Sequence, residues 1–191
     1  MMDVFNYKYS VLMSVYYKEK PDWLRYSIRS ILSQTVMPNE ILIVKDGKLT
    51  NELDSVLNIF IEQYPDLFNI VELPYNKGLG PALAVGVNEC RNEIIIRMDS
   101  DDFSVPNRCE KLLCAMKKHN ECGIIGSYEA EFIDNINNVV AIHRVPELNR
   151  DINQFMKRRC AVLHPTVLYK KSYVLKAGNY RDALLYEDYD L

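Results

Sequence analysis

The chain has 191 residues, of which 48% are hydrophobic and 26% charged, and its net charge at pH 7 is −3. This is the composition of a soluble globular protein large enough to bury a sizeable core. The lack of a basic excess argues against a nucleic-acid partner, and no apolar run reaches the roughly 18 residues of a membrane-spanning helix.

The first residues also lack the charged start and apolar stretch of a secretory signal. The five cysteines form an odd number without framework spacing, which suits a reducing compartment. Cys109, Cys114, His119 and Cys122 fit no common zinc motif, so buried thiols are favoured over a zinc site. The sequence therefore predicts a cytoplasmic protein.

In the first two thirds of the chain, short apolar runs alternate with longer segments of helical period. Strands are predicted at 9–15, 40–45, 69–73 and 93–98. Helices are predicted from Pro21, after a cap at Thr50, over about 80–90, and from Pro106 to about 119. This alternation predicts a largely parallel sheet with helices on both faces.

After residue 122 the pattern changes. Strands are predicted at 123–133 and 139–143 around the polar turn 134–138, as an antiparallel addition. A short helix at 149–158, a strand at 166–169 and a short helix at 172–176 follow. Without a linker or a repeat, the prediction is one α/β domain over 1–191 with a small antiparallel addition in its C-terminal third.

Polar clusters follow the first four predicted strands, namely Tyr16–Glu19, Asp46-Gly47, Tyr75–Gly78 and Asp99–Asp102. Because ligands of open α/β sheets bind beyond the carboxyl ends of the strands, these clusters are expected to converge on one rim. Three carboxylates within 99–102 repel one another unless a cation or fixed donors offset their charge. Their hard oxygen atoms suit Mg²⁺ or Mn²⁺, with a solvated acidic turn as the alternative.

Three further features are ambiguous when each is taken alone. Lys77 lies in a glycine-containing turn before a buried helix, where a diphosphate or only solvent could be its partner. The acidic segment with Glu187 and Asp188 could supply a general base or be merely solvated. His164 is either a metal ligand or a core histidine.

In chain order, the clusters resemble the motifs of the large family 2 of inverting glycosyltransferases, which have the GT-A fold. The resemblance covers about residues 9–190. It is carried by Ser10-Val-Leu-Met-Ser-Val-Tyr-Tyr17, Ser30-Ile-Leu-Ser-Gln-Thr35, Ile43-Val-Lys-Asp-Gly47, Asn76-Lys-Gly-Leu79, the Asp-x-Asp motif Asp99-Ser-Asp-Asp102, and Glu187-Asp188.

The resemblance implies metal-dependent transfer of a sugar, with inversion, from a nucleotide donor to a glycan or lipid-linked acceptor in surface-polysaccharide biosynthesis. The nucleotide would bind within about 9–104, and the acceptor would bind within about 105–191. Asp101 would bind Mn²⁺ or Mg²⁺, with His164 as a second candidate ligand, and Asp188 would be the general base. The implied donor-binding residues are Ser14, Tyr16, Asp46, Lys77, Asp99 and Ser100, with Asp46 accepting from the base and Asp99 contacting the ribose.

The chain also departs from the family pattern. Lys45 and Lys48 replace the usual Asp and Ser around Asp46-Gly47, and Tyr17 replaces a common Asn. A UDP-sugar is favoured as donor, while thymidine and guanosine nucleotides stay open. The chain ends soon after Glu187-Asp188, so a truncation is expected, with disorder at Asp188.

Three other functions compete with this interpretation. A nucleotide-sugar-binding module without turnover is the main alternative, whereas a nucleotidyltransferase or a haloacid-type phosphatase would need a glycine-rich loop or Asp-x-Asp after the first strand. Peripheral association with the inner face of the membrane is compatible with a lipid-linked acceptor.

Overall fold

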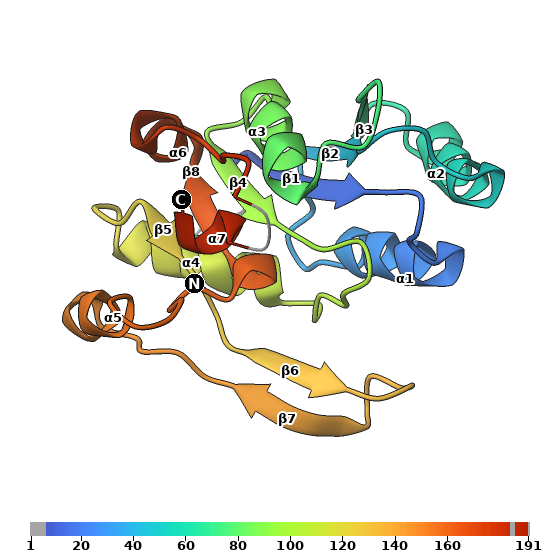
Figure 1. The fold of residues 1–191 in the computed structure, drawn as a ribbon. Coiled ribbons are helices and arrows are strands. Elements are labelled where there is room, and N and C mark those ends of the chain that lie inside the picture. The colour runs from blue at the N-terminus through green and yellow to red at the C-terminus, as the bar shows by residue number, and fades with distance from the viewer. Residues whose placement is uncertain (1–6, 184–185, 191) are drawn as a thin grey trace.

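The computed structural model describes residues 7–183 and 186–190. Its main sheet contains β1 (Tyr9–Val15), β2 (Glu40–Lys45), β3 (Phe68–Glu72), β4 (Ile94–Arg97), β5 (Ile124–Ile125) and β8 (Leu168–Lys170). Their order is β3-β2-β1-β4-β8-β5. The first four strands are parallel, whereas β8 is antiparallel to both β4 and β5 (Figure 1).

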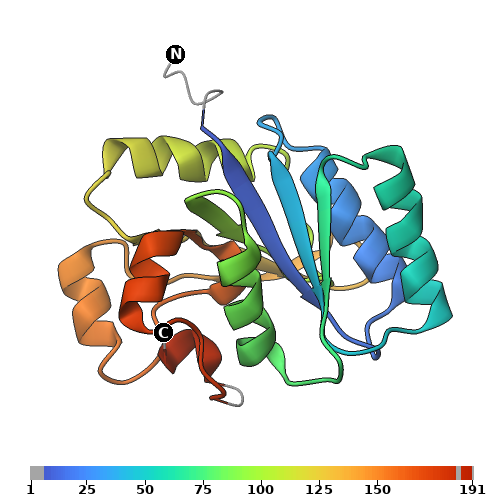
Figure 2. The ribbon, with the colours of Figure 1, turned by 90° about the horizontal axis from the view of Figure 1, so that it is seen from above.

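Helices cover both faces of this sheet and create two apolar cores (Figures 1 and 2). On one face the core side chains of β1 and β2, such as Val11 and Ile43, meet three helices. On the other face, Leu12 and Leu42 meet two helices. The first face carries α1 (Pro21–Leu32), α2 (Asn51–Gln63) and α4 (Arg108–Lys118), and the second carries α3 (Leu79–Glu89) and α6 (Lys171–Ala177). Burial on both sides explains why β1 and β2 are nearly continuous apolar runs.

Local signals set several element boundaries. Pro21 is the first residue of α1, where its missing N–H costs no hydrogen bond. Thr50 caps α2, and its Oγ1 accepts from the backbone N–H of Leu53 at 3.3 Å. The predicted mixed, mostly parallel sheet flanked by helices is confirmed.

Three local predictions were wrong. The strand predicted at 123–133 is two strands, because the chain leaves the main sheet after β5 and then forms β6 (Glu129–Phe132). The helix predicted from Pro106 begins at Arg108, with Asn107 as its N-cap residue. The segment 187–190, where disorder was expected, forms the short helix α7 (Glu187–Asp190), and an ion pair of 2.6 Å joins Arg181 to Asp190.

The predicted hairpin is present and projects away from the main sheet (Figure 1). In it, β6 pairs antiparallel with β7 (Val139–His143). The remaining short elements are α5 (Asn149–Phe155) and the 3-10 helix η1 (His164–Thr166). Among the described residues, no helix combines the length and the apolar character needed to cross a membrane.

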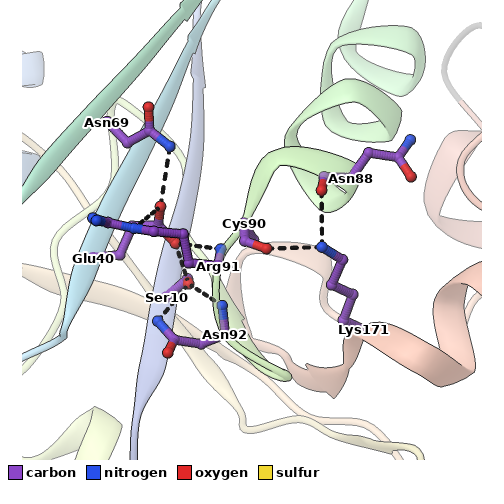
Figure 3. Close-up of polar contacts among 8 residues, drawn as sticks. All are labelled: Ser10, Glu40, Asn69, Asn88, Cys90, Arg91, Asn92 and Lys171. Carbon is purple, nitrogen blue, oxygen red and sulfur yellow. Dashed lines mark hydrogen bonds and ion pairs between the residues drawn. The ribbon is translucent and has the colours of Figure 1, made fainter.

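A buried polar cluster connects the strands at the edge of the sheet where β1, β2 and β3 begin (Figure 3). Glu40, at the start of β2, is fully buried, and its carboxylate accepts four hydrogen bonds. The donors are Ser10 Oγ, Asn69 Nδ2, and the backbone N–H and Nε of Arg91, at 2.5–3.1 Å. This cluster lies at the edge opposite to the polar loops that follow β1, β2 and β4.

Candidate functional site

The loops after β1, β2, β3 and β4 lie at the carboxyl edge of the sheet, as predicted, because these four strands are parallel. Residues Asp99–Asp102, here called the acidic loop, begin one residue after the end of β4. Hydrogen bonds connect this loop to the first helix and to the loop before it. Ser27 Oγ donates to the carbonyl of Asp99 at 2.7 Å, and Ser100 Oγ donates to Glu19 Oε2 at 2.5 Å.

Burial and neighbouring carboxylates raise the pKa of two residues of the acidic loop, Asp101 and Asp102. Burial, together with the charges of Asp99 and Glu19, raises the pKa of Asp101. Burial and the charges of Asp99 and Asp101 raise the pKa of Asp102 to about 6. Neither Asp101 nor Asp102 has an ion-pair partner among the described residues. This negative charge, which Arg97 offsets only in part, fits a divalent cation.

The side chains present would supply only some of the ligands of a cation, and a bound substrate would supply the others. No group of three or more metal-ligating side chains is assembled within the described part of the chain. Mg²⁺ and similar ions are commonly held by one or two carboxylates together with substrate phosphates. The residues present therefore fit a cation that arrives with a diphosphate.

The helix α1 holds the segment that follows the acidic loop. Gln34 Nε2 donates to the carbonyl of Val105 at 2.9 Å, and Gln34 Oε1 accepts from the backbone N–H of Cys109 at 3.0 Å. Ser30 Oγ accepts from the backbone N–H of Ser104 at 3.0 Å. The Ser-Ile-Leu-Ser-Gln-Thr segment thus has a physical role, since its polar side chains fix the chain on the far side of the acidic loop.

Asp46 joins the loop after β2 to the loop after β3. Its carboxylate is buried and accepts from the backbone N–H of Lys77 at 2.7 Å and of Gly78 at 3.0 Å. Gly47 has a φ of +82°, and a Cβ there would lie 2.6 Å from the backbone nitrogen of Asn76. The two loops are therefore in backbone contact, and the observed role of Asp46 is to fix the turn that carries Lys77.

That turn leads into α3, whose N-cap is Gly78 with a φ of +91°. The side chain of Lys77 is exposed, and its Nζ lies 5.4 Å from the centre of the Tyr75 ring. A helix N-terminus beside a mobile cationic side chain is a favourable environment for an anion. The adjacent Lys45 has another role, because its Nζ pairs with Asp54 at 2.9 Å and with Glu72 at 2.7 Å.

The other predicted donor-binding residues follow or end β1. Ser14 is half-buried within β1, and Tyr16 is exposed just after it. The rings of Tyr16 and Tyr17 pack edge to face, with centroids 5.9 Å apart. An exposed aromatic ring at this rim offers a stacking surface for a planar ligand group.

The candidate base lies in α7, next to the start of α3. Asp188 is half-buried in α7. The pKa of Tyr180 is raised to about 12, mainly by burial, and the charges of Asp188 and Asp99 both contribute. A Cβ placed at Gly80 would lie 3.3 Å from the Cβ of Glu187, so the Glu187-Asp188 segment lies beside the start of α3.

His164 is half-buried in η1, beside Tyr180. Its Nε2 lies 2.9 Å from the hydroxyl of Tyr180. Burial and the charge of Arg97 lower the pKa of His164 to about 2, so its ring is neutral at physiological pH. These contacts favour the core-histidine alternative over the metal ligand.

Two residues near the acidic loop were not singled out from the sequence, namely Arg97 and Arg108. Arg97 is almost fully buried and forms an ion pair with Asp99. Burial alone would lower the pKa of Arg97, but the charge of Asp99 outweighs this and raises it. The available signal was a basic residue at the end of an otherwise apolar strand, two positions before the first aspartate.

A cavity of about 940 Å³ opens beside the acidic loop. It extends between α4 and the β6–β7 hairpin, and its lining combines carboxylates with apolar side chains. Among the lining residues are Asp101, Asp102, Phe103, Leu112, Phe132 and Val139. The acidic loop is thus reachable from the hairpin side as well as from the rim.

Comparison with solved structures identifies the fold. A mannosyltransferase, PcManGT from Pyrobaculum calidifontis in complex with GDP-Man and Mn²⁺, superposes with a TM-score of 0.69 at 15% identity, covering 97% of this chain and 51% of that chain. S. aureus TarS 1–349 in complex with UDP-GlcNAc gives a TM-score of 0.69 at 18% identity, covering 95% and 51%. The predicted GT-A fold is confirmed.

Sequence relatives extend this result. The chain is 42% identical over 184 residues to an uncharacterized glycosyltransferase of Haemophilus influenzae, covering 96% of this chain and 67% of the relative. It is 40% identical over 186 residues to the UDP-Gal:alpha-D-GlcNAc-diphosphoundecaprenol beta-1,3-galactosyltransferase of Escherichia coli, covering 96% and 66%. The chain thus spans about two thirds of the length of these curated relatives.

The family described as Glycosyl transferase family 2 matches residues 10–174, which include the rim loops and the acidic loop. The chain belongs to glycosyl transferase family 2.

Proposed function

We propose that this chain is the donor-binding and catalytic part of an enzyme that transfers a hexose from a nucleotide sugar to a growing bacterial surface polysaccharide. The observation that carries the proposal is the acidic loop at the carboxyl end of a buried strand, where burial and mutual repulsion raise the pKa of Asp101 and Asp102. The E. coli relative named above supports a UDP-sugar donor and a lipid-linked acceptor.

In this proposal the donor binds along the rim formed within about residues 9–104. Tyr16 stacks against the base, with Ser14, Ser100 and Asp46 beside it, and Asp99 contacts the ribose. The diphosphate lies near the N-terminus of α3 and Lys77, where backbone N–H groups and one ammonium group face it. UDP is the favoured nucleotide.

Asp101 is the proposed ligand for Mn²⁺ or Mg²⁺, with Asp102 beside it. A bound divalent ion supplies Lewis-acid stabilisation of the negative charge that develops on the departing diphosphate. The chain's own contribution is to hold carboxylates at the end of β4 and to connect them, through Ser27 and Ser100, to α1 and its preceding loop.

Asp188 is the proposed general base. In its ionised form it accepts the proton of the acceptor hydroxyl while that oxygen attacks the anomeric carbon on the face opposite to the diphosphate, which inverts the configuration. The acceptor is proposed to bind within about residues 105–191 and to enter through the cavity beside the hairpin. A lipid-linked acceptor would place the enzyme at the inner face of the cytoplasmic membrane.

Calorimetric titration of UDP in the presence of Mn²⁺ tests the donor site. Asp101→Ala is expected to weaken Mn²⁺-dependent UDP binding by more than about tenfold, because a direct ligand is removed. Asp66→Ala is the matched control, since Asp66 is an exposed acid in the turn before β3, at the opposite edge of the sheet. Equal UDP affinity for Asp101→Ala and the wild type would refute the ligand assignment.

The second candidate function is a nucleotide-sugar-binding module without turnover. It is distinguished by following the release of free nucleotide from UDP-hexoses after binding has been demonstrated. Binding without hydrolysis or transfer, measured also in the longer protein, would favour the module over the enzyme.

A further inference from the structure

Two guanidinium groups are buried directly beneath the acidic loop. Arg97 ends β4 and is 1% exposed, and Arg108 begins α4 and is 9% exposed. The guanidinium of Arg108 donates to the backbone carbonyls of Arg97 and Pro165, each at 2.7 Å. Arg97 instead forms an ion pair with Asp99, while its Nε has no hydrogen-bond partner among the described residues.

A buried charge of this kind is costly unless another charge compensates it, and removal of one partner of a buried pair strongly destabilises a protein. Four carboxylates lie in or beside this loop, namely Asp99, Asp101, Asp102 and Glu19, whose Oε2 accepts from Ser100 Oγ at 2.5 Å. Two guanidinium groups offset only part of this negative charge, and a divalent cation would compensate the remainder.

We propose that Arg97 is a positioning residue that serves as a permanent counter-charge for the acidic loop. It holds Asp99, and through Asp99 the loop, in place during the part of the cycle when no cation is bound. The proposal rests on the proposed function, in which Asp101 is the ligand of a divalent cation. Without a bound cation the loop would lack an external counter-charge, and Arg97 would keep it in place for the next donor.

The pairing of Arg97 with Asp99 also gives the aspartates of the acidic loop different roles. The Asp99 carboxylate pairs with Arg97, so we assign it to this pair and to the ribose, and not to the cation. Asp101 and Asp102, without ion-pair partners among the described residues, are left to face the cation. Removal of Asp99 should therefore act on cation affinity through charge and not through a lost ligand.

Thermal unfolding with and without Mn²⁺, at constant ionic strength, provides the first test. Arg97→Met is expected to lower the melting temperature without metal by about 10 °C, because it leaves Asp99 uncompensated. Mn²⁺ should then raise the melting temperature of this variant by at least about twice the wild-type shift, because the ion replaces the missing positive charge.

Glu40→Gln is the matched control, since Glu40 is a buried charged residue in a hydrogen-bonded cluster at the opposite edge. It is expected to lower the melting temperature while leaving the Mn²⁺-induced shift at the wild-type value. A purely structural role for Arg97 would give the same result as this control, namely destabilisation without a larger response to Mn²⁺. That outcome would overturn the proposal.

A second measurement does not depend on the stability of Arg97→Met. Free Mn²⁺, quantified by its electron paramagnetic resonance signal, gives the affinity for the metal in the presence of UDP. Asp99→Asn leaves Arg97 unopposed and should weaken Mn²⁺ binding about tenfold. The double variant Arg97→Met with Asp99→Asn restores the net charge and should recover most of this loss.

If the double variant stays as weak as Asp99→Asn, the Asp99 carboxylate acts directly on the metal or the nucleotide and not through Arg97, and the proposal is wrong. If the wild-type protein shows no Mn²⁺ response with UDP, the proposed function and this inference fail together. If the wild type responds and Arg97→Met responds equally, only the inference fails.

Discussion

Replacement of Asp46 by Asn tests whether the joined loops after β2 and β3 govern donor binding. The Asp46 carboxylate accepts two backbone hydrogen bonds, of 2.7 Å and 3.0 Å, in a buried position. Hydrogen bonds to a charged acceptor contribute about 1.5–3 kcal/mol each. An Asn side chain keeps one acceptor and turns its NH₂ toward the second N–H, so the expected loss of folding free energy is about 3 kcal/mol.

For a chain of this size, such a loss corresponds to a decrease in melting temperature of about 6–12 °C, measurable by circular dichroism. Asp54→Asn is the control, because Asp54 is a nearby, more exposed acid whose pairing with Lys45 should contribute less than about 1 kcal/mol. A decrease for Asp46→Asn no larger than that of Asp54→Asn would show that the two backbone contacts do not stabilise the fold.

The same variant separates two roles of Asp46 in binding. If Asp46 acts by fixing the turn that carries Lys77, affinities for UDP and GDP with Mn²⁺ should fall by the same factor, about tenfold, because both share the diphosphate. If Asp46 contacts the base directly, the affinities for UDP and GDP should fall by different factors, because the two bases present different N–H edges. The latter result would refute the reasoning from the loop contacts.

Three further predictions follow from other parts of the structure. Glu40→Gln should lower stability by about 3 kcal/mol without changing UDP affinity, because a charged acceptor of four hydrogen bonds is lost far from the rim. Burial alone would raise the pKa of Glu40, but its hydrogen-bond donors outweigh this and lower it. The stabilisation that ionised Glu40 provides is therefore complete above pH 4.5, the unfolded value, and is lost as the pH falls through the folded pKa. The free energy of unfolding, measured as a function of pH, should show this loss in the wild type and not in the variant. Gln34→Leu should cost about 2–4 kcal/mol and weaken Mn²⁺-dependent UDP binding, because the carbonyl of Val105 and the N–H of Cys109 lose their partner; unchanged UDP affinity would contradict a role in holding the acidic loop. Asp188→Asn in the longer protein should preserve UDP binding and abolish transfer, and retained turnover would place the base elsewhere.

Most of the parallel part of the fold could be predicted from sequence, because β1 and β2 are apolar on both faces and therefore read as buried strands. The break between β5 and β6 could not. Residues 123–133 have strand-like composition throughout, and only tertiary pairing with β8 shows where the chain leaves the sheet. The short helix α7 contains four residues, too few for a helical period to be visible.

The position of the site was predictable for the same reason, because polar clusters at the ends of parallel strands must meet at one edge. What the sequence did not reveal was the support beneath these clusters. Arg97 follows three isoleucines and resembles the polar end of a strand, and its burial depends on packing by residues far along the chain. Likewise, the partners of Asp46 are backbone groups, which carry no sequence signature.

The antiparallel position of β8 beside β4 has a consequence for biosynthesis. The strands β1 to β4 come from a contiguous stretch that can assemble through local strand–helix–strand units as the chain emerges from the ribosome. The flank of β4, however, is completed only by β8, and the N–H of Arg97 bonds to the carbonyl of Val167 at 2.9 Å. During translation the part of the chain with β1 to β4 therefore exposes an unpaired edge of β4 until about residue 170 has left the exit tunnel. A holdase chaperone that binds during this interval would protect that edge from aggregation.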